Sequence, residues 1–230
     1  MNEPQIRYAR TSDGVNIAWY AVGEGVPYFW PSTPLGSIGD HWQMPEFREL
    51  MESIARRATL VTCDPRGFGL SDRGEMDYSC EAIVRDYEAV TAAAGIERFV
   101  FQSWSYLAIP ALAFAALHPE RVVAMILING IMRGSDLAAG FKSLVRLAGE
   151  DWDSATRLIS QSNDAGYSLT LTLERGRKSI QRAASQEAFL SFFNLALSVC
   201  SIDARAWANL SISLITTISH TCEIYITPPF

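Results

Sequence analysis

Short apolar runs alternate with longer amphipathic stretches through the first half of the chain. The short runs have strand character and end in loops rich in glycine, proline or aspartate, whereas the longer stretches carry apolar residues at helical spacing. We predict strands at residues 6–9, 17–22, 26–30, 58–63, 99–102 and 122–128, and helices at residues 44–57, 79–94 and 106–117. This alternation predicts an α/β fold in which a mainly parallel, twisted sheet carries helices on both faces.

Local signals mark where several of these elements begin and end. The pair Asp13-Gly14 lies between the two opening runs and is a strong turn signal for an antiparallel hairpin. Ser79 is a suitable N-cap for the helix that follows it, and Gly95 stands where a helix often ends in a left-handed residue. These boundaries are therefore supported independently of the apolar pattern.

The pattern changes after residue 130. Helical periodicity continues to about residue 201, although residues 169–173 also fit a strand, and clear strand-like sequence returns only at residues 211–218 and 223–227. The chain then divides into a core at residues 1–133, an inserted helical lid at residues 134–201, and an incomplete return to the core sheet at residues 202–230.

The composition is that of a globular protein of one domain. The 230 residues are 49% apolar and 19% charged, which permits a substantial core and excludes a mainly disordered chain. A net charge of −6 without clusters of lysine and arginine argues against nucleic acid as the main partner. No segment has the pattern of a signal peptide or a membrane span, so we expect a cytoplasmic protein with no membrane partner.

The sequence offers no pattern for a metal or a cofactor. The four cysteines are widely separated without C-x-x-C spacing, which favours reduced, buried thiols over a zinc site or a disulfide framework. The glycines at residues 67 and 69 do not form a dinucleotide fingerprint. In the same loop we expect Asp64, Arg66 and Asp72 to have a structural role through hydrogen bonds and an ion pair.

Three features of the sequence resemble the α/β-hydrolase superfamily. A short strand and a long apolar helix meet at a sharp turn with Ser105 at its apex, a D-x-R-G-x-G-x-S loop occupies residues 64–71, and His-Pro-Glu-Arg-Val follows at residues 118–122. Residues 5–212 resemble the esterase and lipase-like branch, which includes domains found beside bacterial cyclase and LuxR-type regulatory modules. The resemblance implies an α/β-hydrolase fold with serine hydrolase chemistry.

The resemblance also implies roles for individual residues. Ser105 falls on the nucleophile, and the backbone N–H groups of Tyr106 and Thr33 fall on an oxyanion hole that stabilises charge on a carbonyl oxygen. The family's nucleophile normally lies between two glycines, in the pattern G-x-S-x-G, whereas Ser103 and Leu107 hold those places here. Serine is small enough to replace glycine there, but leucine must fit where helix and strand approach closely.

The resemblance does not supply the rest of a catalytic triad. The family's acid and histidine follow a strand that corresponds here to residues 212–220, and the sequence diverges from that point, which indicates a truncated or frame-altered tail. His220 and, after it, His41 are the candidate bases for the serine. Asp136 lies near where some members place an alternative acid, although it also suits the start of a lid helix.

These expectations lead to two hypotheses for the function. In the first, the protein is a serine hydrolase that cleaves carboxylic esters of small, apolar substrates, with Trp104, Ser32 and Phe141 in the substrate pocket. In the second, it is a catalytically degenerate hydrolase fold that binds or senses a small ligand or packs against a partner. An incomplete sheet with an exposed edge would also permit a homodimer.

Overall fold

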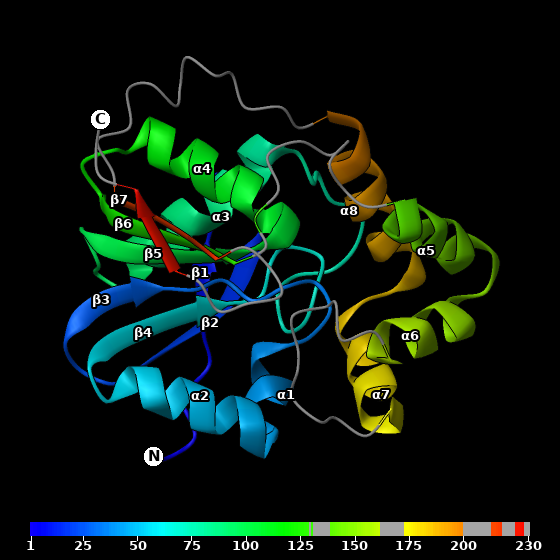
Figure 1. Ribbon diagram of the computed structural model, residues 1–230, viewed down its shortest axis with the longest axis horizontal. Helices are drawn as coiled ribbons and strands as arrows, with labels where there is room; N and C mark the ends of the chain where they lie inside the picture. Colours follow the sequence, from blue (N-terminus) through cyan, green and yellow to red (C-terminus); the bar gives the residue numbers. More distant parts are fainter. Residues whose placement is uncertain (129, 131–138, 162–172, 200–212, 218–223, 228–230) are drawn as a thin grey trace.

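The described strands of this computed structural model form one eight-stranded sheet in the order β1-β2-β4-β3-β5-β6-β7-β8 (Figure 1). The structure describes residues 1–128, 130, 139–161, 173–199, 213–217 and 224–227. The strands are β1 (Arg7–Arg10), β2 (Asn16–Val22), β3 (Val26–Phe29), β4 (Ala58–Cys63), β5 (Phe99–Trp104), β6 (Val122–Ile128), β7 (Ser213–Thr217) and β8 (Ile224–Thr227). Neighbours from β4 across to β7 are parallel, whereas β1, β2 and β8 pair antiparallel, which confirms the predicted mainly parallel sheet.

Helices cover both faces of this sheet. They are α1 (Ile38–Gln43), α2 (Pro45–Ala55), α3 (Cys80–Ala93), α4 (Ala108–Leu117), α5 (Ala139–Glu150), α6 (Trp152–Gln161), α7 (Leu173–Ala183) and α8 (Gln186–Val199), with a single 3-10 turn at Ser105–Leu107 before α4. In Figure 1, α3 and α4 lie on one face, α1 and α2 on the other, and α5 to α8 form a group beside the sheet. Most of the run at residues 169–173, which also fits a strand, lies outside the described residues.

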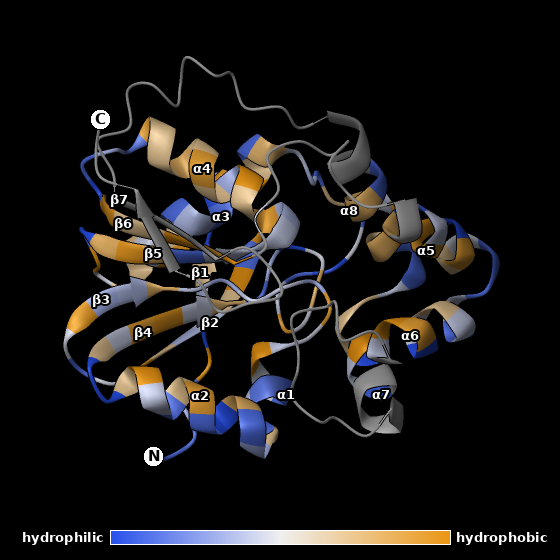
Figure 2. Ribbon diagram, viewed as in Figure 1, coloured by the Kyte–Doolittle hydropathy of each residue, from blue (hydrophilic) through white to orange (hydrophobic). Residues whose placement is uncertain are grey.

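Two apolar cores lie on opposite faces of the sheet. Beneath α3 and α4, the rings of Phe29, Phe99, Phe101 and Phe114 meet at centroid separations of 5.1–5.8 Å. A smaller core beneath α1 and α2 contains Tyr20, Trp30, Trp42, Met44, Phe47, Met51 and Leu60. Figure 2 shows α4 and the central strands as markedly hydrophobic elements, consistent with their position between other layers.

A buried arginine anchors the loop after β4. Arg66 has 1% of its side chain exposed, and it donates hydrogen bonds to Asp86 of α3 and to Asp13 in the turn between β1 and β2. Burial raises the pKa of Asp86 to about 6, whereas hydrogen bonding from Arg66 holds the pKa of the more exposed Asp13 well below its usual range. Asp72 accepts hydrogen bonds from the backbone and side chain of Asn16. These contacts confirm the structural role predicted for Arg66 and Asp72.

Removal of this arginine is expected to destabilise the fold strongly. Arg66→Ala leaves the buried Asp86 carboxylate without its partner, so the free energy of unfolding should fall by about 3–5 kcal/mol. Urea unfolding followed by circular dichroism checks this. Arg157→Ala removes an exposed pair with Asp153 on α6 and should cost no more than about 0.5 kcal/mol. Similar losses in the two variants would contradict the assigned role of Arg66.

Candidate active site

The turn after β5 holds Ser105 in a strained backbone conformation. Ser105 has a φ of 49° and is the one residue other than glycine with a positive φ in the described part of the chain. Such a conformation costs about 1–2 kcal/mol and persists only where the surroundings impose it. Tyr106 and Leu107 next to it are 6% and 1% exposed, so their packing fixes the turn. The structure thus places a hydroxyl at the sharp strand-to-helix junction that the sequence predicts.

The cost of this conformation should be measurable. Glycine adopts a positive φ freely and alanine does not, so Ser105→Gly should be more stable than Ser105→Ala by about 1 kcal/mol. Both variants lack the hydroxyl, and therefore their urea unfolding curves isolate the backbone effect. Ser160 inside α6 is the control, because there glycine should be the less stable replacement. The same order of stability at both positions would contradict a strained turn at Ser105.

Thr33 follows the strand next to the one that carries Ser105. Phe29 at the end of β3 pairs with Phe101 of β5. The chain after β3 continues along β4, because the backbone N–H of Ser32 donates to the carbonyl of Cys63 over 2.8 Å. Two parallel neighbours therefore end at the same edge of the sheet, one followed by Thr33 and the other by Ser105. A pair of oxyanion amides on one carbonyl oxygen requires this kind of placement.

A buried carboxylate links the loop after β4 to α1. Oδ1 of Asp64 accepts the backbone N–H of Ile38 over 2.8 Å, and Oδ2 accepts the N–H of Leu70 over 2.8 Å and the hydroxyl of Ser37 over 3.1 Å. Burial raises the pKa of Asp64 to about 7, against the effect of these three donors. The carboxylate fixes the first turn of α1, immediately after Gly36 in the loop that contains Thr33.

His41 of α1 is buried against that loop. Its side chain stacks on Phe47 of α2 with a centroid separation of 4.4 Å, and its Nε2 atom lies so close to Gly36 that a β-carbon there would overlap it. Burial lowers the pKa of His41 to about 4, so the ring is neutral at pH 7. The imidazole therefore supports the loop that carries Thr33 as an uncharged packing group.

A small cavity lies between this histidine and the residue before Ser105. Its volume is about 20 Å³, which is room for roughly one water molecule. The lining side chains are Trp30, Ser32, Thr33, His41, Phe47, Met51, Thr62 and Trp104. The indoles of Trp30 and Trp104 stack at 5.8 Å with an interplanar angle of 10°. The structure thus brings together Trp104, Ser32 and Thr33, three of the residues predicted for the site.

The neutral, buried state of His41 predicts a pH dependence of stability. Its pKa is about 4 in the folded protein and about 6.5 in an unfolded chain, so the unfolded state takes up the proton first as the pH falls. We expect stability that is present above pH 6.5 to be lost toward pH 4, by up to about 3 kcal/mol. The difference between the wild type and His41→Gln, measured by urea unfolding from pH 4 to 8, isolates this contribution from those of the carboxylates.

The control for this measurement is His118→Gln, which changes the histidine that contacts Glu88 at the end of α4. A difference curve for His41→Gln that is no steeper than the one for His118→Gln would show that His41 is not held in a buried, neutral state.

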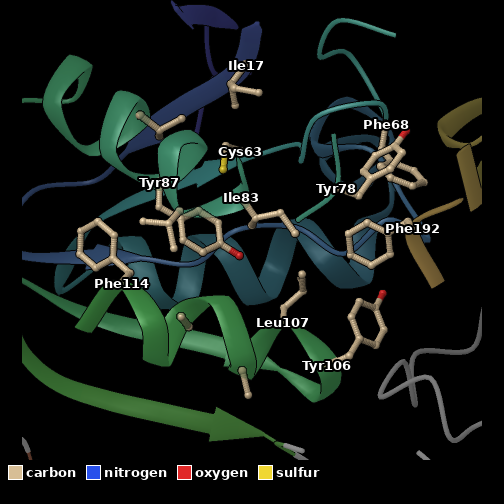
Figure 3. Packing of buried hydrophobic residues seen from close by; sticks show 14 of the residues in the cluster. Ile17, Cys63, Phe68, Tyr78, Ile83, Tyr87, Tyr106, Leu107, Phe114 and Phe192 are labelled. Carbon is tan, nitrogen blue, oxygen red and sulfur yellow. The ribbon is translucent and has the colours of Figure 1, made fainter. Parts of the chain in front are cut away.

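The ring of Tyr106 lies in the opposite core from Trp104. It meets Phe192 and Phe193 of α8 at centroid separations of 5.6 and 4.8 Å, and Phe141 of α5 at 6.3 Å. Figure 3 shows Tyr106 and Phe192 near one another at the end of this core. The residues predicted for the substrate pocket therefore fall on two sides of the turn, with Trp104 and Ser32 on one and Phe141 on the other.

Two of the predicted catalytic residues, His220 and Asp136, lie outside the described residues. Within the described part of the chain, no group of three or more His, Cys, Asp or Glu side chains is arranged to hold a metal ion. None of the helices in that part is both long enough and apolar enough to cross a membrane.

Sequence reasoning missed α1 and the contacts around it. The segment Ile38–Gln43 contains glycine and aspartate near its start, which are poor helix formers, and it spans only six residues. The available signal was Ser37, whose hydroxyl accepts the N–H of Gly39 as an N-cap. The burial of His41 has no local signal at all, because it depends on packing against another helix.

Comparison with known families agrees with this architecture. The model of the alpha/beta hydrolase fold family matches residues 36–179, which is more than half of the chain. The protein therefore belongs to the α/β-hydrolase family, as the motifs of its sequence predict.

Solved structures of several hydrolases share the fold at low sequence identity. A carboxylesterase structure from Nitrososphaera gargenis has a TM-score of 0.71 and 17% identity, covering 91% of this chain and 79% of that one. An esterase from Rhodococcus sp. has a TM-score of 0.69 and 23% identity, covering 92% and 79%. A meta-cleavage product hydrolase from Pseudomonas fluorescens has a TM-score of 0.71 and 22% identity, covering 91% and 78%. Because these neighbours carry out different reactions, the likeness shows the fold alone.

Proposed function

We propose that this protein is a serine hydrolase that cleaves carboxylic esters of small, apolar substrates. Ser105 Oγ attacks the carbonyl carbon and forms an acyl-enzyme, the alcohol leaves with the serine's proton, and water then releases the acid. The backbone N–H groups of Tyr106 and Thr33 stabilise the oxyanion of each tetrahedral intermediate. The observation that carries the proposal is the left-handed Ser105 at the end of β5, one strand away from the loop of Thr33.

In this proposal the α5–α8 helices form a lid over an apolar acyl pocket. Support comes from the ring contacts of Phe141 and of two α8 phenylalanines with Tyr106, the residue after the nucleophile. The side of the site next to α8 is therefore aromatic, which suits a small apolar substrate. The esterases among the structural neighbours are consistent with ester chemistry.

The mechanism needs a base that carries the serine's proton to the leaving alcohol. His220 remains the first candidate, with Asp136 as the acid that orients it. The contacts of His41 favour a packing role, because its Nε2 atom lies against the backbone of Gly36 and its ring is stacked on Phe47. His41 is therefore the second candidate for the base.

A second candidate function is ligand binding without catalysis. Leu107 replaces the usual glycine and is 1% exposed, and the cavity beside Trp104 holds only about one water molecule. Both observations suit a hydrolase fold that has kept the strained turn while losing turnover.

Hydrolysis of p-nitrophenyl acetate distinguishes the two functions. For the serine hydrolase we expect a burst of p-nitrophenol followed by slow turnover, because the acyl-enzyme accumulates when deacylation lacks a well-placed base. Ser105→Ala should abolish both the burst and labelling by a fluorophosphonate, whereas Ser160→Ala on α6 should leave them unchanged. Identical traces for the wild type and Ser105→Ala, with no labelling of either, would exclude the enzyme and favour the binding protein.

A further inference from the structure

The short helix α1 lies between the α5–α8 group and the loop of Thr33. On its outer side, Oδ2 of Asp40 accepts hydrogen bonds from the Ser179 hydroxyl over 3.0 Å and from Arg182 Nη2 over 3.1 Å, and both donors belong to α7. On its inner side, the next residue, His41, packs against Gly36. Two adjacent residues of one helix thus contact the α5–α8 group and the proposed oxyanion loop.

We infer that Asp40 is a positioning residue, which transmits the docking of α7 through α1 and His41 to the loop that places the Thr33 amide. The inference rests on the proposed function for its catalytic consequence, but the mechanical link from α7 to the loop stands on contacts alone.

The link is stiff because α1 is held at both of its sides. Asp64 fixes its first turn through Ile38 and Ser37, and Asp40 fixes its middle through α7. A helix of six residues has few internal hydrogen bonds, so these external contacts define its position. Any shift of α1 moves the imidazole of His41, and Gly36 cannot avoid that ring because the two are already in close contact.

A second pair of contacts joins α7 to the same region and makes the docking specific. The N–H of Gly69 donates to the carbonyl of Ala183 over 2.8 Å, and Nη2 of Arg73 donates to the carbonyl of Arg182 over 2.6 Å. Both donors lie in the loop that also sends the N–H of Leu70 to Asp64. The end of α7 therefore contacts both segments that the Asp64 carboxylate joins.

The loss of this link should lower kcat more than it raises KM. A displaced amide weakens stabilisation of the transition state while the apolar pocket for the substrate is unaltered. For Asp40→Ala we expect kcat for p-nitrophenyl acetate to fall about five- to tenfold, less than the 10²- to 10³-fold cost of losing an oxyanion donor outright. Asp40→Asn keeps an acceptor for the Ser179 hydroxyl and should recover part of the loss.

Hydrogen exchange of the wild-type protein and four variants tests the mechanical link directly. Asp40→Ala and Arg182→Met should speed exchange of backbone amides in peptides that span residues 31–44, with peptides of β5 and β6 as the internal reference for global stability. The double variant should exchange no faster than either single one, because both remove the same contact. The control is Arg157→Met, which removes an exposed ion pair confined to α6.

Faster exchange of residues 31–44 in the two Asp40-contact variants but not in Arg157→Met, together with a fall in kcat at nearly constant KM, supports the inference. Exchange that matches the Arg157→Met control overturns it, as does faster exchange without any change in kcat of an active enzyme. A wild type without Ser105-dependent turnover would sink the proposed function alone, and the exchange comparison would then decide whether α7 positions the loop. If Asp40→Ala does not fold, Asp40→Asn and Arg182→Met carry the same comparison.

Discussion

A carboxylate with no access to solvent holds together the loops around the proposed site. Asp64 is 0% exposed, so its oxygens need donors from the protein, and two backbone amides and a hydroxyl supply them. These donors come from segments that are 26 and 6 residues away in sequence. The same oxygens approach Gly69 so closely that a β-carbon there would overlap them. The glycine pattern of this loop is therefore a consequence of the buried charge beside it.

The sheet was largely predictable because its strands are continuous apolar runs with clear ends. The predicted bounds of β4 and β6 match the structure, and the hydroxyl of Ser79 caps α3 through the N–H of Ala82 as expected. Gly95 has the predicted left-handed conformation with a φ of 68°. The helix predicted from residue 106 instead begins at Ala108, since the strained turn at Ser105 first continues as a 3-10 turn. Local pattern thus determined most elements, and tertiary strain displaced one boundary.

The candidate site was predictable only where it follows from strand order. Ser105 stands at a strand-to-helix junction that the apolar pattern reveals, and Thr33 and Ser32 lie near it because β3 and β5 are neighbours. The role of α1 was beyond prediction, because Asp40 meets Arg182 from 142 residues away and no local pattern records that pairing. The fold and the turn identify an α/β-hydrolase, whereas the identity of the base depends on residues that the sequence motifs do not specify.

The two partners of Arg66 have a consequence for the order of events in folding. The hairpin of β1 and β2 closes a short loop and forms locally, but Asp13 in its turn meets Arg66 only across 53 residues. Such a contact forms after the parallel strands between have been placed, because closing long loops costs entropy before any contact repays it. The arginine therefore acts late, as a lock on a sheet already assembled, and its main kinetic effect is to slow the escape of the finished molecule from the native state.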